Sequence, residues 1–369
     1  MATRAIGVGA VAVLLLAACG SDDAAPPAVT STTTTEPTTT PSTASSSFPA
    51  TTPSPETTMP DGDTDGATSY ESPIDLGGTW AHDINNSGVI VGTLGGVSGE
   101  GERGTVGQDN ARAIWWPEPS SSPQLLDVNP GELSFGWAVN DEGEILVRTG
   151  HPEAPTAALV IDPQSGVTKE LPAPDNGHAE AWAFNDRAEV LVSIRQEWEQ
   201  PFPKFVVWDA RTGGIEVPPD LDGQHYVLHD INDHGDVVGH VLAPFGAPFF
   251  WDRTENVLHD LNVGGAEQGY ATALNDHGQI VGLVRADMQA PDQAAVWDDR
   301  GSPPRVFDHC GRFTDINNSG HLLCGTWVSH PESNDVAELP AIVGNAAAVN
   351  DLGQVVGQSG GHAALWNPR

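Results

Sequence analysis

The sequence predicts an all-β protein: a seven-bladed β-propeller that is closed by its own N-terminal strand and preceded by a disordered stalk. Three observations predict this fold. A motif such as DINDHGDVVG, Asp230–Gly239, recurs in seven copies. The copies follow one another at intervals of 33 to 55 residues, which is the length of a four-stranded propeller blade. The segment before the copies is rich in Ser, Thr and Pro and holds too few apolar residues to build a core.

Residues 1–18 have the pattern of a signal peptide. Arg4 supplies a positive charge, and the apolar run from Ala5 to Leu16 is too short to span a bilayer as a stable helix. The next residues, LAAC, resemble a bacterial lipobox, in which the cysteine receives acyl chains such as palmitate. We therefore expect lipidation at Cys19 and an extracytoplasmic protein that is lipid-anchored to the cell membrane. The alternative is an ordinary secretory signal that ends near a chance cysteine.

Residues 19–71 form the expected stalk, a disordered linker of Ser, Thr and Pro. At ~3.1 Å per residue it would reach on the order of 100–150 Å. Its end, Asp61–Gly66 (DGDTDG), is similar to the first half of a calcium loop, although Ser72 occupies the twelfth position where a Glu is needed. An acidic tether explains the same residues. The sequence thus assigns no cofactor and leaves the metal unknown, with calcium as an open option.

Residues 72–369 carry the repeat, and each copy predicts a strand, a tight turn and a second strand. An apolar residue precedes a recurrent Asn, and Gly follows the Asn by three positions in six copies. Asn accepts local backbone hydrogen bonds at the start of such a turn, and Gly takes the positive φ at its end. The third copy has Ala188 at the Gly position, where we expect strain of ~1 kcal/mol. The recurrent residues are Asn85, Asn140, Asn185, Asn232, Asn275, Asn317 and Asn350.

A second motif, such as FFWDR around Trp251, follows most copies and predicts a third strand, with a short fourth strand after it. One Trp per unit fits either a stacking platform for sugars or the core between blades, and the core is the commoner use. Copy two has Ile161 at this place. Copy six lacks a clear Trp motif, so whether its blade is complete stays open.

The two ends of the repeat region predict how the ring closes. The last copy stops after its third strand, whereas the region begins with SPIDLG, Ser72–Gly77, which resembles a fourth strand without partners. We expect Ile74–Leu76 to pair beside Ala363–Trp366. This pairing would leave no open sheet edge.

The repeat unit resembles the HAF family of probable extracellular repeats. The resemblance rests on Ile231–Gly239, on His362–Trp366 and on Asp75–Gly77, and it covers nearly all of residues 72–369. It implies extracytoplasmic placement and a β-propeller-like fold. It implies no established activity, so there are no catalytic residues to transfer. Copies two and three depart most, with Val147 and Val192 at the second Gly position.

Cys310 and Cys324 flank the sixth hairpin and predict a disulfide. Outside the cytosol, two cysteines 14 residues apart across a turn usually pair. The turn places Cys324 nearer Phe313 than Cys310, so the segment at Cys310 must bend back. A bond that closes a loop of about 15 residues is worth roughly 3 kcal/mol in the chain-entropy model.

Four residues are candidates for ligand binding. Asp83, Asp230 and Asp315 each stand two residues before the repeat Asn, on the strand expected to be innermost. They would either surround a channel opening and hold a cation or cap backbone N–H groups, and capping is favoured. Trp198 lies in a longer, variable loop, which is where recognition usually occurs on a rigid ring.

Charge and missing motifs bound the function. Asp and Glu number 50 against 15 Lys and Arg, a formal charge of −35, which disfavours nucleic acid as a partner. Phosphate-loop, nucleophile-elbow and zinc-protease motifs are absent from the sequence. We therefore expect a monomeric binding or scaffolding module of unknown ligand, rather than an enzyme, with a cell-wall glycan or an envelope protein as partner. The alternative is a propeller hydrolase or lyase that acts on cell-wall or environmental glycans.

Overall fold

The computed structural model describes residues 69–95, 110–126, 128, 133–150, 157–171, 177–195, 202–219, 225–242, 246–308, 310–330, 336–342 and 344–369. In these ranges the regular secondary structure is entirely β-strand. The expected signal peptide, Cys19, the DGDTDG segment and Trp198 lie outside the described residues, as does nearly all of the expected stalk. Across the described ranges, we find no helix with the length and apolar character needed to cross a bilayer.

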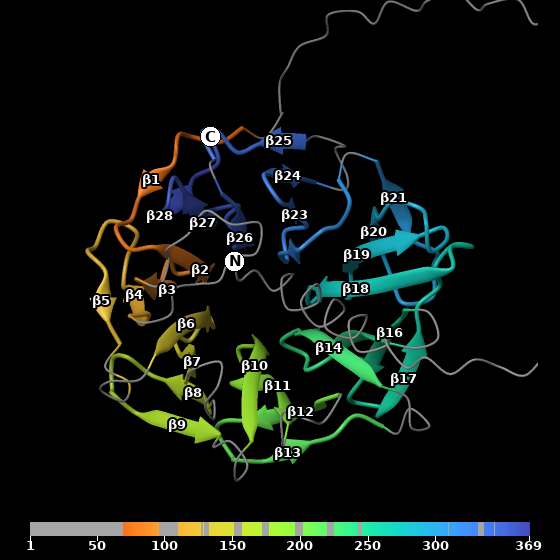
Figure 1. Cartoon of the computed structure of the whole chain (residues 1–369), viewed down its shortest axis with the longest axis horizontal. Helices are drawn as coiled ribbons and strands as arrows, with labels where there is room; N and C mark the ends of the chain where they lie inside the picture. Colours follow the sequence, from red (N-terminus) through yellow and green to blue (C-terminus); the bar gives the residue numbers. More distant parts are fainter. Residues whose placement is uncertain are drawn as a thin grey trace, which may run out of the picture.

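Seven four-stranded antiparallel sheets surround a central axis, as Figure 1 shows. Blades 1 to 3 are β2 (Trp80–Ile84), β3 (Ile90–Leu94), β4 (Arg112–Trp116), β5 (Gln124–Leu125); β6 (Ser134–Val139), β7 (Ile145–Thr149), β8 (Ala157–Ile161), β9 (Thr168–Leu171); and β10 (His178–Phe184), β11 (Glu189–Arg195), β12 (Lys204–Asp209), β13 (Ile215–Glu216). Blades 4 and 5 are β14 (Tyr226–Ile231), β15 (Val237–Val241), β16 (Ala247–Asp252), β17 (Val257–Asp260); and β18 (Gln268–Leu274), β19 (Ile280–Arg285), β20 (Gln293–Trp297), β21 (Arg305–Phe307). Blades 6 and 7 are β22 (Asp315–Ile316), β23 (Leu322–Cys324), β24 (Trp327–Ser329), β25 (Val336–Glu338); and β26 (Ala346–Val349), β27 (Val355–Ser359), β28 (His362–Trp366), β1 (Ile74–Asp75).

The N-terminal strand closes the ring, which confirms the predicted arrangement. β1 is the outermost strand of blade 7 and pairs with β28 in the register Ile74↔Leu365. The N–H of Leu76 then donates to the carbonyl of Ala363 at 3.0 Å. Blade 7 therefore takes its outermost strand from the N-terminal end of the ring and its other three strands from the C-terminal end.

The inner hairpins have the turn geometry that the motif predicts. In blade 4, the N–H of Gly235 donates to the carbonyl of Asn232 at 3.0 Å, and Gly235 has a φ of 87°. Ala188 adopts a φ of 56° at the same place in blade 3, so this turn is kept despite the side chain. The hairpins of copies two and three are both formed. Blade 6 has all four strands and is complete, although β22 is only two residues long.

The recurrent Trp residues form part of the core. Trp116, Trp251, Trp297 and Trp366 are fully buried, so they cannot serve as exposed platforms for sugars. In blade 1 the core position belongs to Trp116, which pairs with Ile90, whereas Trp115 is half-buried. Blade 6 places Trp327 on its third strand, although this segment lacks a clear Trp motif.

Cys310 and Cys324 are joined by a disulfide, with Cα atoms 6.4 Å apart. Cys324 ends β23, and Phe313 lies in the segment between the two cysteines. The disulfide therefore connects the segment that leads into blade 6 to β23, the second strand of that blade. β23 pairs with the two-residue inner strand β22.

Candidate functional site

The turns between the first and second strands of all seven blades meet around the central channel, and their Asn side chains form a closed belt. In each turn the amide nitrogen of the recurrent Asn donates to the backbone carbonyl of the recurrent Asn in the next blade. The seven distances run from 2.5 to 3.4 Å, and the last bond returns from Asn350 to Asn85 at 3.0 Å. We call this set the asparagine belt: Asn85, Asn140, Asn185, Asn232, Asn275, Asn317 and Asn350.

Asparagine suits this position because the side chain must both accept and donate. In blade 1, Oδ1 of Asn85 accepts the N–H groups of Ser87 at 3.1 Å and Val89 at 2.8 Å, which fixes the turn. Its Nδ2 atom is then left to reach the next blade. The belt residues are only 3 to 6% exposed, so an Asp there would bury a charge and lose the donor.

The residue after each belt Asn forms a second closed ring. A side-chain oxygen of this residue accepts the N–H of its counterpart in the preceding blade, at 2.6 to 2.8 Å in all seven places. We call this set the aspartate belt: Asn86, Asp141, Asp186, Asp233, Asp276, Asn318 and Asp351.

The two amides of the aspartate belt divide its five carboxylates into two kinds. Nδ2 of Asn86 donates to Oδ2 of both Asp141 and Asp351, at 2.7 and 2.8 Å. Nδ2 of Asn318 donates to Oδ2 of Asp276 at 2.8 Å. Among the described residues, no amide reaches Asp186 or Asp233 in this way.

Asp186 and Asp233 resist ionisation because they are partly buried. Burial, assisted by the negative charges of Asp186 and Asp276, raises the pKa of Asp233 to about 7. Burial also raises the pKa of Asp186, against the lowering effect of the N–H of Asp141. The mouth therefore contains an adjacent pair of carboxyl groups that holds a proton near neutral pH.

The three predicted candidates on the inner strands lie at the same mouth but are already engaged. Oδ2 of Asp83 accepts the N–H of Val139 at 3.0 Å, and Oδ2 of Asp315 accepts that of Val349 at 3.1 Å. Oδ2 of Asp230 likewise accepts the N–H of Leu274 at 3.1 Å. Each carboxylate thus caps the innermost strand of the following blade, and this geometry agrees with the capping interpretation.

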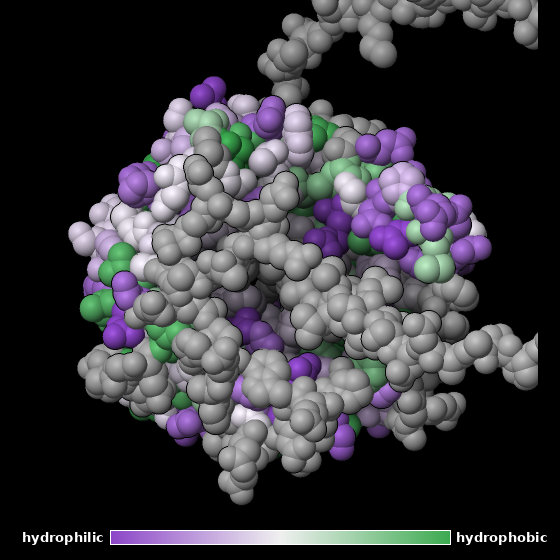
Figure 2. Space-filling view, in the orientation of Figure 1, coloured by the Kyte–Doolittle hydropathy of each residue, from purple (hydrophilic) through white to green (hydrophobic). Residues whose placement is uncertain are grey.

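A cavity of about 160 Å³ lies at this mouth and is lined by residues from all seven blades. Both belts contribute to its wall, together with Asp83, Asp230 and Asp315. None of the exposed large apolar residues among the described ranges lines this cavity. Figure 2 shows a face of the ring on which hydrophilic and apolar residues alternate along the rim. The mouth is polar, because the amide and carboxylate side chains of both belts line it.

The aspartate belt was missed by the sequence reasoning, although a signal for it is present. Every copy has Asp or Asn directly after the recurrent Asn. An Asp or Asn at this position is also common in an isolated turn. Its repetition therefore does not by itself predict hydrogen bonds between blades. The contact partner lies in another blade, 33 to 55 residues away along the chain for six of the seven bonds.

Solved structures share the fold. The RRP9 WD40 repeats align with a TM-score of 0.53 at 13% identity, over 82% of this chain and 99% of that one. YCF48 bound to D1 peptide gives 0.52 at 12% identity, over 80% and 95%. The β-propeller domain of the Trilobed protease from Pyrococcus furiosus, which has an open velcro topology, gives 0.51 at 9% identity, over 82% and 97%. At these identities the similarity shows a seven-bladed propeller fold alone.

No family model and no curated protein sequence matches the chain. Two other similar structures are longer. The chain spans 64% of TolB from Acinetobacter baumannii, with a TM-score of 0.45 and 11% identity. It spans 50% of a prolyl endopeptidase, with a TM-score of 0.51 and 14% identity. The activities of such proteins do not transfer to this chain.

Proposed function

We propose that the chain is a monomeric, lipid-anchored, extracytoplasmic propeller of the HAF type that acts as a binding or scaffolding module. The observation that carries this proposal is the mouth cavity, whose wall comes from all seven blades and is fixed by two closed hydrogen-bonded belts. A wall held in this way is preorganised, so little conformational freedom is lost when a ligand enters. The signal peptide, Cys19 and the stalk would present this mouth away from the membrane.

The lining determines which ligand chemistry the mouth accepts. Five carboxylates of the aspartate belt and the carbonyl groups of the turns offer acceptors. An anionic ligand would meet like charge, and an apolar ligand would strip water from acceptors without replacing it. A ligand that brings positive charge or several hydrogen-bond donors fits best, whether it comes from a basic protein segment or from an amino sugar of the cell wall.

Affinity capture from envelope extracts, with and without calcium, tests this function. The mouth variant carries Asp186→Asn with Asp233→Asn, which keeps each oxygen that accepts a backbone N–H. The matched control carries Asp162→Asn with Asp299→Asn on outer turns and has the same change in formal charge. We expect a component that the parent and the control retain and the mouth variant loses. If the mouth variant retains it while Trp198→Ala loses it, recognition lies on the loop face and the proposed mouth is wrong.

The anchor is tested separately with Cys19→Ser. We expect the parent chain in the membrane fraction and the variant in the soluble extracytoplasmic fraction, because acyl chains would be the only attachment. Equal distribution of the two proteins would contradict lipidation at Cys19.

One observation favours the second candidate, a hydrolase or lyase that acts on glycans. Asp186 and Asp233 are neighbouring carboxyl groups, and the raised pKa of Asp233 suits a general acid. Both groups, however, also hold backbone N–H groups of the ring. Release of reducing ends from cell-wall glycans that is abolished by Asp233→Asn would establish this function instead of simple binding.

A further inference from the structure

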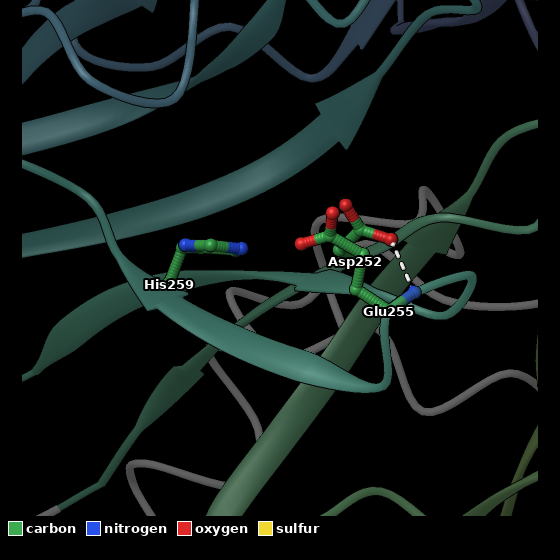
Figure 3. Close-up of side chains that lie close together, drawn as sticks. All are labelled: Asp252, Glu255 and His259. Carbon is green, nitrogen blue, oxygen red and sulfur yellow. Dashed lines mark hydrogen bonds between the residues drawn. The ribbon is translucent and has the colours of Figure 1, made fainter.

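A second group of polar side chains lies in the outer half of blade 4, away from the innermost strands that carry the two belts. Asp252 ends β16, Glu255 lies in the turn that follows, and His259 is on β17. One ligand atom from each of the three residues lies within 4.8 Å of the other two. Figure 3 shows the two carboxylates side by side, with a ring nitrogen of His259 pointing toward them.

The strand register explains why these side chains meet. Asp252 pairs with Val257, and Phe250 pairs with His259. Residues two apart on a strand share a face, so Asp252 and His259 are diagonal neighbours on one face of the sheet. The turn adds Glu255, whose N–H donates to Oδ1 of Asp252 at 3.0 Å.

Sister turns in other blades show what is unusual here. In blade 2 the hydroxyl of Ser165 donates to Asp162, and in blade 3 the hydroxyl of Thr212 donates to Asp209 at 2.6 Å. Both hydroxyl residues stand three positions after the Asp. Blade 4 has Glu255 at that position, so a donor is replaced by a second carboxylate.

Two further observations concern the side chains of this group. Nε2 of His259 is buried and has no hydrogen-bond partner among the residues that the structure describes. A buried imidazole nitrogen without a partner is costly unless something else satisfies it. Arg300 from blade 5 donates to Oδ2 of Asp252 at 2.8 Å, which holds this carboxylate in place beside Glu255 and His259.

We propose that Asp252, Glu255 and His259 bind a divalent transition-metal cation, with Zn²⁺ as the representative ion. One imidazole and two carboxylates are a common ligand set for such ions, whereas Ca²⁺ prefers oxygen ligands alone. Bond lengths of about 2.0–2.2 Å require the ligand atoms to approach one another, and the exposed side chain of Glu255 is free to make that adjustment. Arg300 would remain beside the site as the partner that orients Asp252.

Calorimetric titration of the metal-free full-length chain with ZnCl₂ tests the site, compared with Glu255→Gln and His259→Gln. The matched control is Asp209→Asn, which changes the sister turn of blade 3. We expect one site that each ligand variant weakens by at least about 10-fold, in line with the loss of one metal ligand or its support. The control should change the affinity less than about 2-fold.

Titration with Co²⁺ gives a second readout, because coordination by these side chains produces visible absorption bands that Glu255→Gln alters. Glu255 is exposed, so this variant keeps its fold even if His259→Gln does not. Absence of zinc binding, or equal binding by the parent and Glu255→Gln, would overturn the proposal. Neither result would bear on the function proposed for the mouth, because the mouth residues belong to the inner turns.

Discussion

The inner and outer turns of the propeller use the same residue types for different purposes. At the inner turns, each Asn completes its own turn and also donates to the next blade. At the outer turn of blade 3, Asp209 binds within its own turn: it accepts the N–H groups of Arg211 and Thr212 and the hydroxyl of Thr212. Inner turns therefore couple all seven blades in closed cycles of hydrogen bonds. Outer turns form no such cycle, and blades meet there only through single side chains such as Arg300, which donates to Asp252.

This difference explains where the chain tolerates variation. A change in one inner turn disturbs a cycle of seven bonds, because each belt residue contacts a neighbour on both sides. A change in an outer turn leaves this cycle intact, because outer-turn residues are not members of the belt. Blade 4 can replace the hydroxyl of the outer turn by Glu255 without opening the ring.

The largest expected effect separates Asn185→Ala from Asp209→Ala. Asn185 is buried and bonds to Arg187, Glu189 and the carbonyl of Asn232. Its loss should lower the free energy of unfolding by about 3 kcal/mol, because buried partners are left unsatisfied. Asp209→Ala should lower it by about 1 kcal/mol, since water replaces the lost bonds at an exposed turn. Urea denaturation measures both, and equal losses would remove the distinction between inner and outer turns.

An intermediate effect should be the same in both regions. Gly278 in an inner turn and Gly213 in an outer turn have a φ of 76°, and an added Cβ would meet no atom within 4 Å at either place. Only backbone strain then changes, so Gly278→Ala and Gly213→Ala should each lower stability by about 1 kcal/mol. A clearly larger loss at Gly278, measured in the same denaturation series, would show that the inner turn also resists a purely local change.

The smallest effect concerns pH at the aspartate belt. Because the pKa of Asp233 is raised in the folded protein to about 7, the folded state binds a proton that the unfolded state releases above its ordinary pKa. The contribution of this group to stability is therefore full below about pH 4 and is lost as pH rises toward 7 and beyond. Asp233→Asn should raise Tm at pH 8 by about 1–2 °C after screening by solvent, with little change at pH 4.

Differential scanning calorimetry of the parent and Asp233→Asn at both pH values measures this effect. The matched control is Asp141→Asn, because Asp141 already receives the amide of Asn86. A gain at pH 8 for Asp141→Asn as large as that for Asp233→Asn would contradict the division of the belt into two kinds of carboxylate.

Much of the fold was predictable because its signals are local and repeated. The Asn and Gly of each inner turn, the Trp on the third strand and the unpartnered Ile74–Leu76 segment predicted seven hairpins and the closing strand, as observed. Trp116 was harder to identify than Trp251, because two Trp residues are adjacent in blade 1.

The site was less predictable because its contacts join different blades. The sequence identifies Asn85 as a turn residue, but its donation to Asn140 depends on how neighbouring sheets approach one another. The raised pKa of Asp233 depends on its burial and on the charges of Asp186 and Asp276, which belong to neighbouring blades. Asp252, Glu255 and His259 are brought together by a strand register that periodicity alone does not fix.

Hydrogen exchange at the aspartate-belt N–H groups tests the central claim, that backbone N–H groups of the inner turns bind across blades whereas those of outer turns such as Gln164 and Arg211 bind within their own turn. These seven groups donate to a neighbouring blade, although Asn86 and Asp141 are exposed residues. We predict exchange as slow as that of the buried strands at all seven, because exchange requires two blades to separate. The N–H groups of Gln164 and Arg211 on outer turns should exchange much faster. Equally fast exchange at both sets of turns would contradict the account.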